Sequence, residues 1–247
     1  MSGVVVLVGD RDADPLVPAL EEALAARHLP ARTVSPAALA ATRLACGGDW
    51  CAIDGAPVAA VVFRASPMLL VAPGFGEDDA GFAASELRAV WAHVLAIPGV
   101  PAVNRAYADS WLSSSEWSFW RRRLAAGGVA VAPRRIGRPH AEGRWIRWTG
   151  GDEPSPDARA AERLGVASVA CGTPTRMLCC VGETIDGDRC IASVAAALLR
   201  EGLVLAEALL DEEGRLVGVE TVPAVPPVLA GELSSRLAGW IGAALGG

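Results

Sequence analysis

Apolar strands and amphipathic helices alternate along the first hundred residues, and this alternation limits the fold more than any other feature of the sequence. The expected strands lie at residues 4–8, 31–34, 58–63 and 100–103, and the expected helices at residues 14–28 and 83–95. Asp14 and Pro15 are a strong start signal for the first helix, with a capping carboxylate followed by proline at the first helical position. This order of elements predicts a small, mostly parallel sheet, and therefore an α/β fold.

The second half of the chain begins with a long amphipathic helix and continues with antiparallel strands. Within residues 98–133, Asn104-Arg105 forms a turn before the helix, and Gly127-Gly128 ends it. Later strands are expected at residues 145–148, at 166–170 paired with 177–181, and at 203–210 paired with 216–222. Helices are expected at residues 191–201 and 229–245. This half is expected to be of the α+β class.

Composition excludes several classes of function. The chain has 247 residues, of which 52% are hydrophobic and 20% charged, as in a globular protein. A net charge of -6 argues against a nucleic-acid surface, which needs a basic stripe. No apolar run reaches the roughly 18 residues of a membrane span, and the N-terminal residues lack the basic segment of a secretory signal. A cytoplasmic location, with no nucleic acid and no membrane as partner, is therefore expected.

All 22 basic residues are arginine, because the chain contains no lysine. A Schiff base, a phosphate-binding P-loop lysine and a lysine general base are therefore excluded. Any phosphate charge would have to be neutralised by arginine, whose planar guanidinium suits a different geometry from an ammonium group.

Six cysteines raise the question of a metal or thiol site. Cys46 and Cys51 flank a Gly-Gly-Asp-Trp turn, and no Cys-x-x-Cys pair is present. The adjacent Cys179 and Cys180 would point to opposite faces of a strand. Buried free thiols are the expectation, with a thiol site that includes Cys46 and Cys51, or a cysteine-dependent metal site, as alternatives.

Tryptophan and arginine gather on the long helix after residue 105. Trp117 and Trp120 are three residues apart and share one face, and Arg121 follows them. Such a stripe usually packs in the core. Because tryptophan and arginine are also favoured as interface anchors, the same three residues are a candidate partner-binding surface, and both interpretations stay open.

Several motifs occur in the order found in one known family. Arg64 ends the strand VVFRASP, Asn104-Arg105-Ala106 follows the next strand, and GVAVAP follows the long helix. Near the C-terminal end, Glu207 precedes Glu220-Thr221-Val222-Pro223. In this order the chain resembles the ATP-grasp superfamily, in particular the MvdD-like ligases that mature ribosomal peptides, the graspetide group.

The resemblance implies a fold, two domains and a set of site residues. A parallel α/β domain of the pre-ATP-grasp kind would span residues 1–105, and a truncated ATP-grasp-like α+β domain would span 106–247. In an active enzyme Arg147 and Arg105 would contact the nucleotide, and Glu207 and Glu220 would hold Mg²⁺.

The sequence also departs from the family pattern at the places that carry its chemistry. Glu116 or Trp117 stands where the family has a nucleotide-binding lysine, and Val222 stands where it has a metal-binding asparagine. The stretch available for the phosphate lid, residues 149–164, is short. The first hypothesis is therefore a degenerate protein that binds a peptide substrate or a partner enzyme in ribosomal peptide (RiPP) modification, without a cofactor. The alternative is an active carboxylate–amine ligase that uses ATP and Mg²⁺ and proceeds through an acyl-phosphate. A homodimer is expected as an option in either case.

Overall fold

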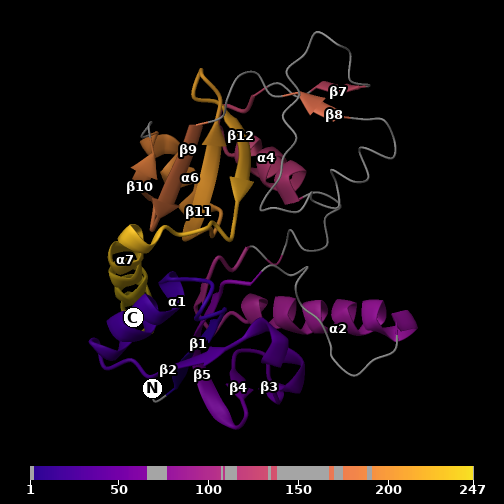
Figure 1. Cartoon of the computed structure of the whole chain (residues 1–247), viewed down its shortest axis with the longest axis vertical. Helices are drawn as coiled ribbons and strands as arrows, with labels where there is room; N and C mark the ends of the chain where they lie inside the picture. The colour runs from indigo at the N-terminus through magenta and orange to yellow at the C-terminus, as the bar shows by residue number, and fades with distance from the viewer. Residues whose placement is uncertain are drawn as a thin grey trace. The chain divides into compact units, whose positions relative to one another are not determined.

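The computed structural model describes residues 3–65, 77–106, 108, 116–132, 135–137, 167–169, 175–187 and 191–246 (Figure 1). The chain forms two compact units. The first contains Met1–Trp111, Gly202–Leu205 and Val222–Gly247, and the second contains Leu112–Glu201 and Ala206–Thr221. Because the chain re-enters the first unit twice, neither unit is one continuous segment. The domain boundary expected at residues 105/106 stays a prediction.

The first unit contains a sheet with strand order β2-β1-β5-β4-β3, in which β6 also pairs with β5. Its strands are β1 (Val4–Val8), β2 (Ala31–Val34), β3 (Leu44–Cys46), β4 (Cys51–Ile53), β5 (Ala56–Phe63) and β6 (Ala102–Val103). β1 runs parallel to β2 and β5, and β6 runs parallel to β5, so the expected parallel sheet is confirmed. β3 and β4 add an antiparallel hairpin that is not predicted from the sequence.

Helices bury the apolar residues of this sheet. They are α1 (Leu16–Ala25), α2 (Glu77–Ala96) and α7 (Pro227–Gly246), with a 3₁₀ helix at Pro36–Ala41. α1 and α7 lie side by side in Figure 1 and pack against each other. α2 begins at Glu77, earlier than the expected residue 83, and its Trp91 ring lies 5.7 Å from the ring of Phe63.

The second unit contains an antiparallel sheet with strand order β10-β9-β11-β12. Its strands are β9 (Thr175–Cys180), β10 (Glu183–Gly187), β11 (Leu205–Leu210) and β12 (Leu216–Glu220), and its helices are α4 (Glu116–Ala126) and α6 (Ala192–Arg200). α4 packs on β12, and α6 packs on β10 (Figure 1). The expected α6, the β11–β12 hairpin and the end of α4 at Ala126 are confirmed.

One expected strand pairing is wrong. β8 (Ala167–Val169) pairs with β7 (Arg135–Gly137) in a separate two-stranded sheet, whereas β9 pairs with β10. The cause is the tight turn at Val181-Gly182, where both residues have positive φ and join β9 directly to β10. The strand expected at residues 145–148 lies outside the described residues. No helix in the described ranges has the length and hydropathy needed to cross a bilayer.

Candidate functional site

Glu207 and Glu220 are brought together by the β11–β12 hairpin. In the antiparallel register these two residues are directly opposite each other, although thirteen positions separate them in sequence. Directly opposed residues share one face of a sheet and have Cβ atoms about 5 Å apart. Two carboxylates in this arrangement can approach one divalent cation with oxygen ligands. These residues are the predicted metal ligands of an active enzyme, and the fold makes them neighbours.

The surroundings of Glu207 contain both signs of charge. Its side chain is 12% exposed, and Arg176 Nε on β9 lies 3.5 Å from Glu207 Oε1. Burial raises the pKa of Glu207 above its usual value, Arg176 opposes this rise, and Asp186 adds to it. Among the residues that the structure describes, no group of three or more His, Cys, Asp and Glu side chains is placed to hold a metal ion.

Val222 stands at the position of the expected asparagine ligand, two residues after Glu220, and its side chain packs against apolar residues. It is partly buried against the hydrophobic cluster of the first unit, which includes Val61, Phe63 and Trp91. A valine side chain carries no oxygen, so it adds nothing to the ligand set of Glu207 and Glu220. The residues present therefore fit a Mg²⁺ ion in part, with two carboxylates in place.

Arg105 makes structural contacts in the first unit. Its Nη1 donates to the carbonyl oxygens of Ala96 (3.1 Å) and Ile97 (2.9 Å), and its Nη2 donates to that of Val100 (2.6 Å). Ala96 is the last residue of α2, so the guanidinium satisfies carbonyls at the end of that helix. Burial lowers the pKa of Arg105. These three bonds occupy the group that was expected to contact a nucleotide, a role that stays a prediction.

Asn104 holds the start of β11 in the first unit. Its Nδ2 donates to the carbonyl oxygen of Leu205 at 2.6 Å, and its Oδ1 accepts from the Leu205 N–H at 2.8 Å. Asn104 is 3% exposed and adopts φ 56°, a left-handed conformation that asparagine tolerates better than most residues. Leu205 is the first residue of β11, so these two hydrogen bonds hold the start of that strand within the first unit.

Arg64 is held in a similar way at the end of β5. Its Nε lies 2.8 Å from Asp14 Oδ2, and its Nη2 donates to the carbonyl oxygen of Pro223 at 2.9 Å. The side chains of Arg64 and Asp14 are only 6% and 15% exposed. Asp14 also accepts from the N–H of Leu16 at the start of α1, as expected for a helix-capping carboxylate. Arg64 therefore ties together three segments of the first unit.

The residues of the candidate partner surface on α4 differ in how far they are buried. Trp120 is fully buried, edge-on to Phe119 with ring centroids 4.9 Å apart, so its indole belongs to the core and is not offered to a partner in this conformation. Arg121 is half-buried, and the side chain of Trp117 lies outside the described part of the chain. A partner-binding role for Trp117 and Arg121 stays a prediction. Arg147 also lies outside the described residues.

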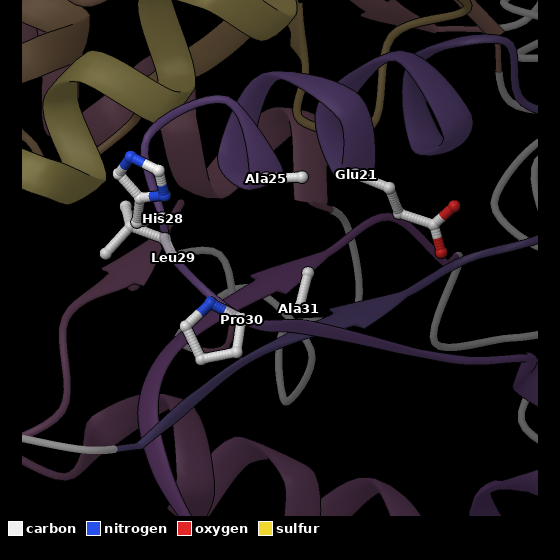
Figure 2. A pocket seen from close by; sticks show the side chains of 6 residues that line it. All are labelled: Glu21, Ala25, His28, Leu29, Pro30 and Ala31. Atoms are coloured by element: carbon white, nitrogen blue, oxygen red, sulfur yellow. The ribbon is translucent and has the colours of Figure 1, made fainter.

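A surface pocket lies between α1 and β2, lined by Glu21, Ala25, His28, Leu29, Pro30 and Ala31 (Figure 2). Figure 2 shows Glu21 and His28 at opposite ends of this lining. The Glu21 carboxylate already binds Arg11, at 2.9 Å, and the hydroxyl of Thr33. Because its polar groups are separated or paired, this pocket is a weaker candidate site than the Glu207–Glu220 pair.

Comparison by sequence finds no matching family model and no matching curated protein. Comparison by structure finds strong likeness to solved enzymes. The ATP-grasp ligase PsnB, solved with precursor peptide PsnA2 and AMPPNP, is similar with a TM-score of 0.69 and 18% identity, over 99% of both chains. The macrocyclase MdnC of Microcystis aeruginosa MRC, bound to precursor peptide MdnA, has a TM-score of 0.66 and 11% identity, over 97% of this chain and 99% of that one.

A third similar structure is a RiPP-associated ATP-grasp ligase of Chryseobacterium gregarium, in complex with ADP and a leader and core peptide. Its TM-score is 0.63 at 7% identity, over 98% of this chain and 97% of that one. At this identity the likeness establishes the fold. It confirms the mixed α/β architecture with a parallel and an antiparallel sheet that was expected from the motif order. The matches cover 97% or more of both chains, which gives no support to the expected truncation of the second domain.

Proposed function

We propose that this chain, which has the fold of the RiPP-associated ATP-grasp ligases, binds a peptide in the modification of ribosomal peptides without itself forming a bond. PsnB, MdnC and the Chryseobacterium ligase were each solved with a peptide on this fold. The present chain keeps the fold over almost its whole length while its sequence departs at the positions that carry charge. Peptide binding is therefore the property that the fold supports, separately from catalysis.

One observation carries the non-catalytic part of this proposal: Val222 packs into the hydrophobic cluster of the first unit, where an oxygen ligand would be needed beside Glu220. Mg²⁺ demands a near-octahedral set of oxygen ligands. Two further features point the same way. The chain has no lysine to neutralise phosphate, and the Arg105 guanidinium is bonded to three backbone carbonyls.

A second candidate function is an ATP-dependent carboxylate–amine ligase, and the opposed Glu207–Glu220 pair favours it. These carboxylates would hold Mg²⁺, which supplies positive charge to the phosphates of ATP. The reaction would convert a peptide carboxylate to an acyl-phosphate, with release of ADP, before an amine displaces the phosphate. Arg176, which lies beside Glu207, would have to yield its ion pair when the metal binds.

Ligand-induced stabilisation separates the two candidates. The melting temperature of the wild-type protein is measured with and without millimolar ATP and Mg²⁺, beside a Glu207→Gln/Glu220→Gln double variant. A ligand that binds only the folded state stabilises it by about 2.7 kcal/mol at one hundred times its Kd. The non-catalytic proposal expects no shift in either protein. A shift in the wild type that the double variant loses would overturn it in favour of the ligase.

Peptide binding needs its own measurement. Fluorescently labelled precursor peptides encoded beside the gene are titrated with the protein, and anisotropy is followed without nucleotide. The proposal expects saturable binding and, after addition of ATP and Mg²⁺, no ADP release and no change of peptide mass. Absence of binding to every such peptide would contradict the peptide-binding part, whatever the nucleotide result. Light scattering of the same samples tests the expected homodimer.

A further inference from the structure

Two thiols meet across the β3–β4 hairpin of the first unit, far along the chain from the acidic pair. Cys46 and Cys51 are directly opposite each other in the antiparallel register, and their Sγ atoms lie 3.2 Å apart. Cys46 is exposed, whereas Cys51 is 2% exposed and belongs to the hydrophobic cluster of this unit. The proposed function uses neither thiol.

The hydrogen bonds of the hairpin show which kind of cross-strand pair this is. The N–H of Gly47 donates to the carbonyl oxygen of Trp50 at 2.9 Å, and the N–H of Asp54 donates to that of Arg43 at 2.8 Å. Because hydrogen-bonded and non-hydrogen-bonded pairs alternate along an antiparallel ladder, Cys46 and Cys51 form a non-hydrogen-bonded pair. Their Cα atoms are then about 4.5 Å apart, within the range of about 4.4–6.8 Å that a disulfide spans.

The backbone around the pair is held in place by close contacts at the turn. A Cβ atom on Gly47 would meet Trp50 Nε1 at 2.2 Å, so the indole lies directly against this glycine. A Cβ atom on Gly99 would meet the carbonyl oxygen of Asp49 at 2.0 Å, so the turn also rests against the loop before β6. The two sulfur atoms therefore face each other on a constrained hairpin, and a bond between them needs little movement of the chain.

We propose that Cys46 and Cys51 are a redox-active dithiol that closes a cross-strand disulfide by exchange with a low-molecular-weight disulfide. This inference is independent of the proposed function. The unequal exposure of the two residues sets the order of reaction. The exposed Cys46 thiolate attacks one sulfur of the small disulfide and releases the first small thiol, leaving a mixed disulfide on Cys46.

Cys51 then completes the exchange. Its deprotonated sulfur attacks Cys46 Sγ, the protein disulfide forms, and the second small thiol leaves. Two protein thiols have been oxidised, one small disulfide has been reduced to two thiols, and no other reactant is needed. Burial and the neighbouring Cys46 thiol raise the pKa of Cys51 to about 12, which lowers the fraction of Cys51 thiolate available for this second step.

The closed bond would sit at the edge of the sheet. β3 is the last strand in the order β2-β1-β5-β4-β3, so the disulfide would fix this edge strand to its neighbour β4. Two thiols are fewer than the four ligands that a structural zinc site requires, whereas they are complete for a disulfide. The chemistry of the pair therefore fits oxidation better than metal binding.

The test uses the reduced full-length protein and oxidised glutathione. After incubation, free thiols are alkylated and the protein is digested with trypsin. Cleavage after Arg43 and after Arg64 releases both cysteines in the single peptide 44–64. The proposal expects this peptide to lose two hydrogen atoms and to carry no alkyl group. The buried Cys179 and Cys180 are the internal control and are expected to stay reduced.

Two serine variants test the order of the steps. Cys51→Ser is expected to stop at the mixed disulfide, with one glutathione on Cys46. Cys46→Ser, at an exposed position where folding is not at risk, is expected to leave Cys51 unmodified. Full alkylation of both cysteines in the wild type, a lasting glutathione adduct in the wild type, or a link from Cys46 to any cysteine other than Cys51 would overturn the proposal.

Discussion

At the scale of single residues, Arg64 is a charged side chain that is both buried and held by two partners. It is 6% exposed, pairs with Asp14 and donates to the carbonyl oxygen of Pro223. Removing one partner of a buried ion pair leaves the other charge without compensation. Arg64→Ala is therefore expected to lower the free energy of unfolding by about 3 kcal/mol, measured by urea denaturation.

The matched control is the exposed pair of Arg236 and Glu232 on α7. Arg236 Nη2 lies 3.0 Å from Glu232 Oε1, one helical turn away, with side-chain exposures of 36% and 50%. Solvent-exposed pairs of this spacing contribute about 0.5 kcal/mol or less. If Arg236→Ala lowered the free energy of unfolding as much as Arg64→Ala, burial would not explain the larger effect expected at Arg64.

Glu207 makes the stability of the protein depend on pH, and the sign of this dependence is defined. Its pKa is raised in the folded protein, so the folded state holds this proton more tightly than the unfolded state. The contribution of Glu207 to stability therefore falls as pH rises from the usual glutamate value of about 4.3 to the higher folded value. Glu207→Gln is expected to become more stable relative to wild type across this window, measured by urea unfolding at a series of pH values.

Asp211, in the β11–β12 turn, is the comparison of opposite sign. Burial raises the pKa of Asp211, but the Arg215 N–H and guanidinium, with the Glu213 N–H, outweigh it and lower that pKa overall. The contribution of Asp211 to stability is present above the usual aspartate pKa. It is lost as pH falls through the lower pKa that Asp211 has in the folded state. Asp211→Asn is therefore expected to differ from wild type most at neutral pH and least in acid. Equal slopes for the two variants would show that neither carboxyl is perturbed as the structure indicates.

At the scale of elements, α1 and α4 end in the same hydrogen-bond pattern with different residues at the critical position. In α1, Leu29 N–H donates to the Leu24 carbonyl and His28 N–H donates to that of Ala25; in α4, Val129 and Gly128 do the same to Leu124 and Ala125. Both patterns are Schellman motifs, which place a left-handed residue after the helix. That residue is His28 with φ 58° in α1 and Gly128 with φ 86° in α4.

Exchanging the residue type at these two positions should change stability in opposite directions. His28→Gly is expected to stabilise the protein by about 1 kcal/mol, because glycine adopts positive φ without the steric cost of a Cβ. Gly128→Ala is expected to destabilise it by about 1 kcal/mol, since no other atom lies near the added methyl and the cost is that of the backbone alone. Thermal and urea unfolding of both variants measure the difference. Changes of the same sign would contradict this account.

These elements also show how far the sequence could predict the fold. Gly127-Gly128 is a helix stop that any pattern would reveal, and the end of α4 was predicted correctly. The β3–β4 hairpin was missed because its strands have three residues each, too short for an alternating pattern. The partner of β8 was missed because β7, also of three residues, lies about thirty positions earlier in the chain.

The candidate site was partly predictable for a related reason. The order of the motifs singled out Glu207 and Glu220, and the hairpin between them, a local feature, places them opposite each other. The roles of Arg105 and Asn104 were not predictable, because their bonds depend on where α2 ends and on a contact with Leu205, about one hundred positions away. Contacts between residues so far apart in the chain leave no periodic signal in the sequence.

At the scale of the whole molecule, the first unit depends on segments from both ends of the chain. α7 buries Leu233, Leu237 and Ile241, each fully, and packs against α1. A fragment of residues 1–111 lacks α7 and the Leu205 backbone that Asn104 binds. It is expected to lack the cooperative unfolding transition of the full chain in circular dichroism and to be digested by protease under conditions that the full chain resists. Addition of a synthetic peptide of residues 222–247 is the control, and partial recovery of helix signal is expected.

The discontinuous first unit has a consequence for how the protein is made. β1 and α1 are translated well before α7, which packs against α1, so the face of α1 that α7 covers stays exposed while the chain between these two helices is made. That face of α1 would be accessible to chaperones until α7 has emerged from the ribosome.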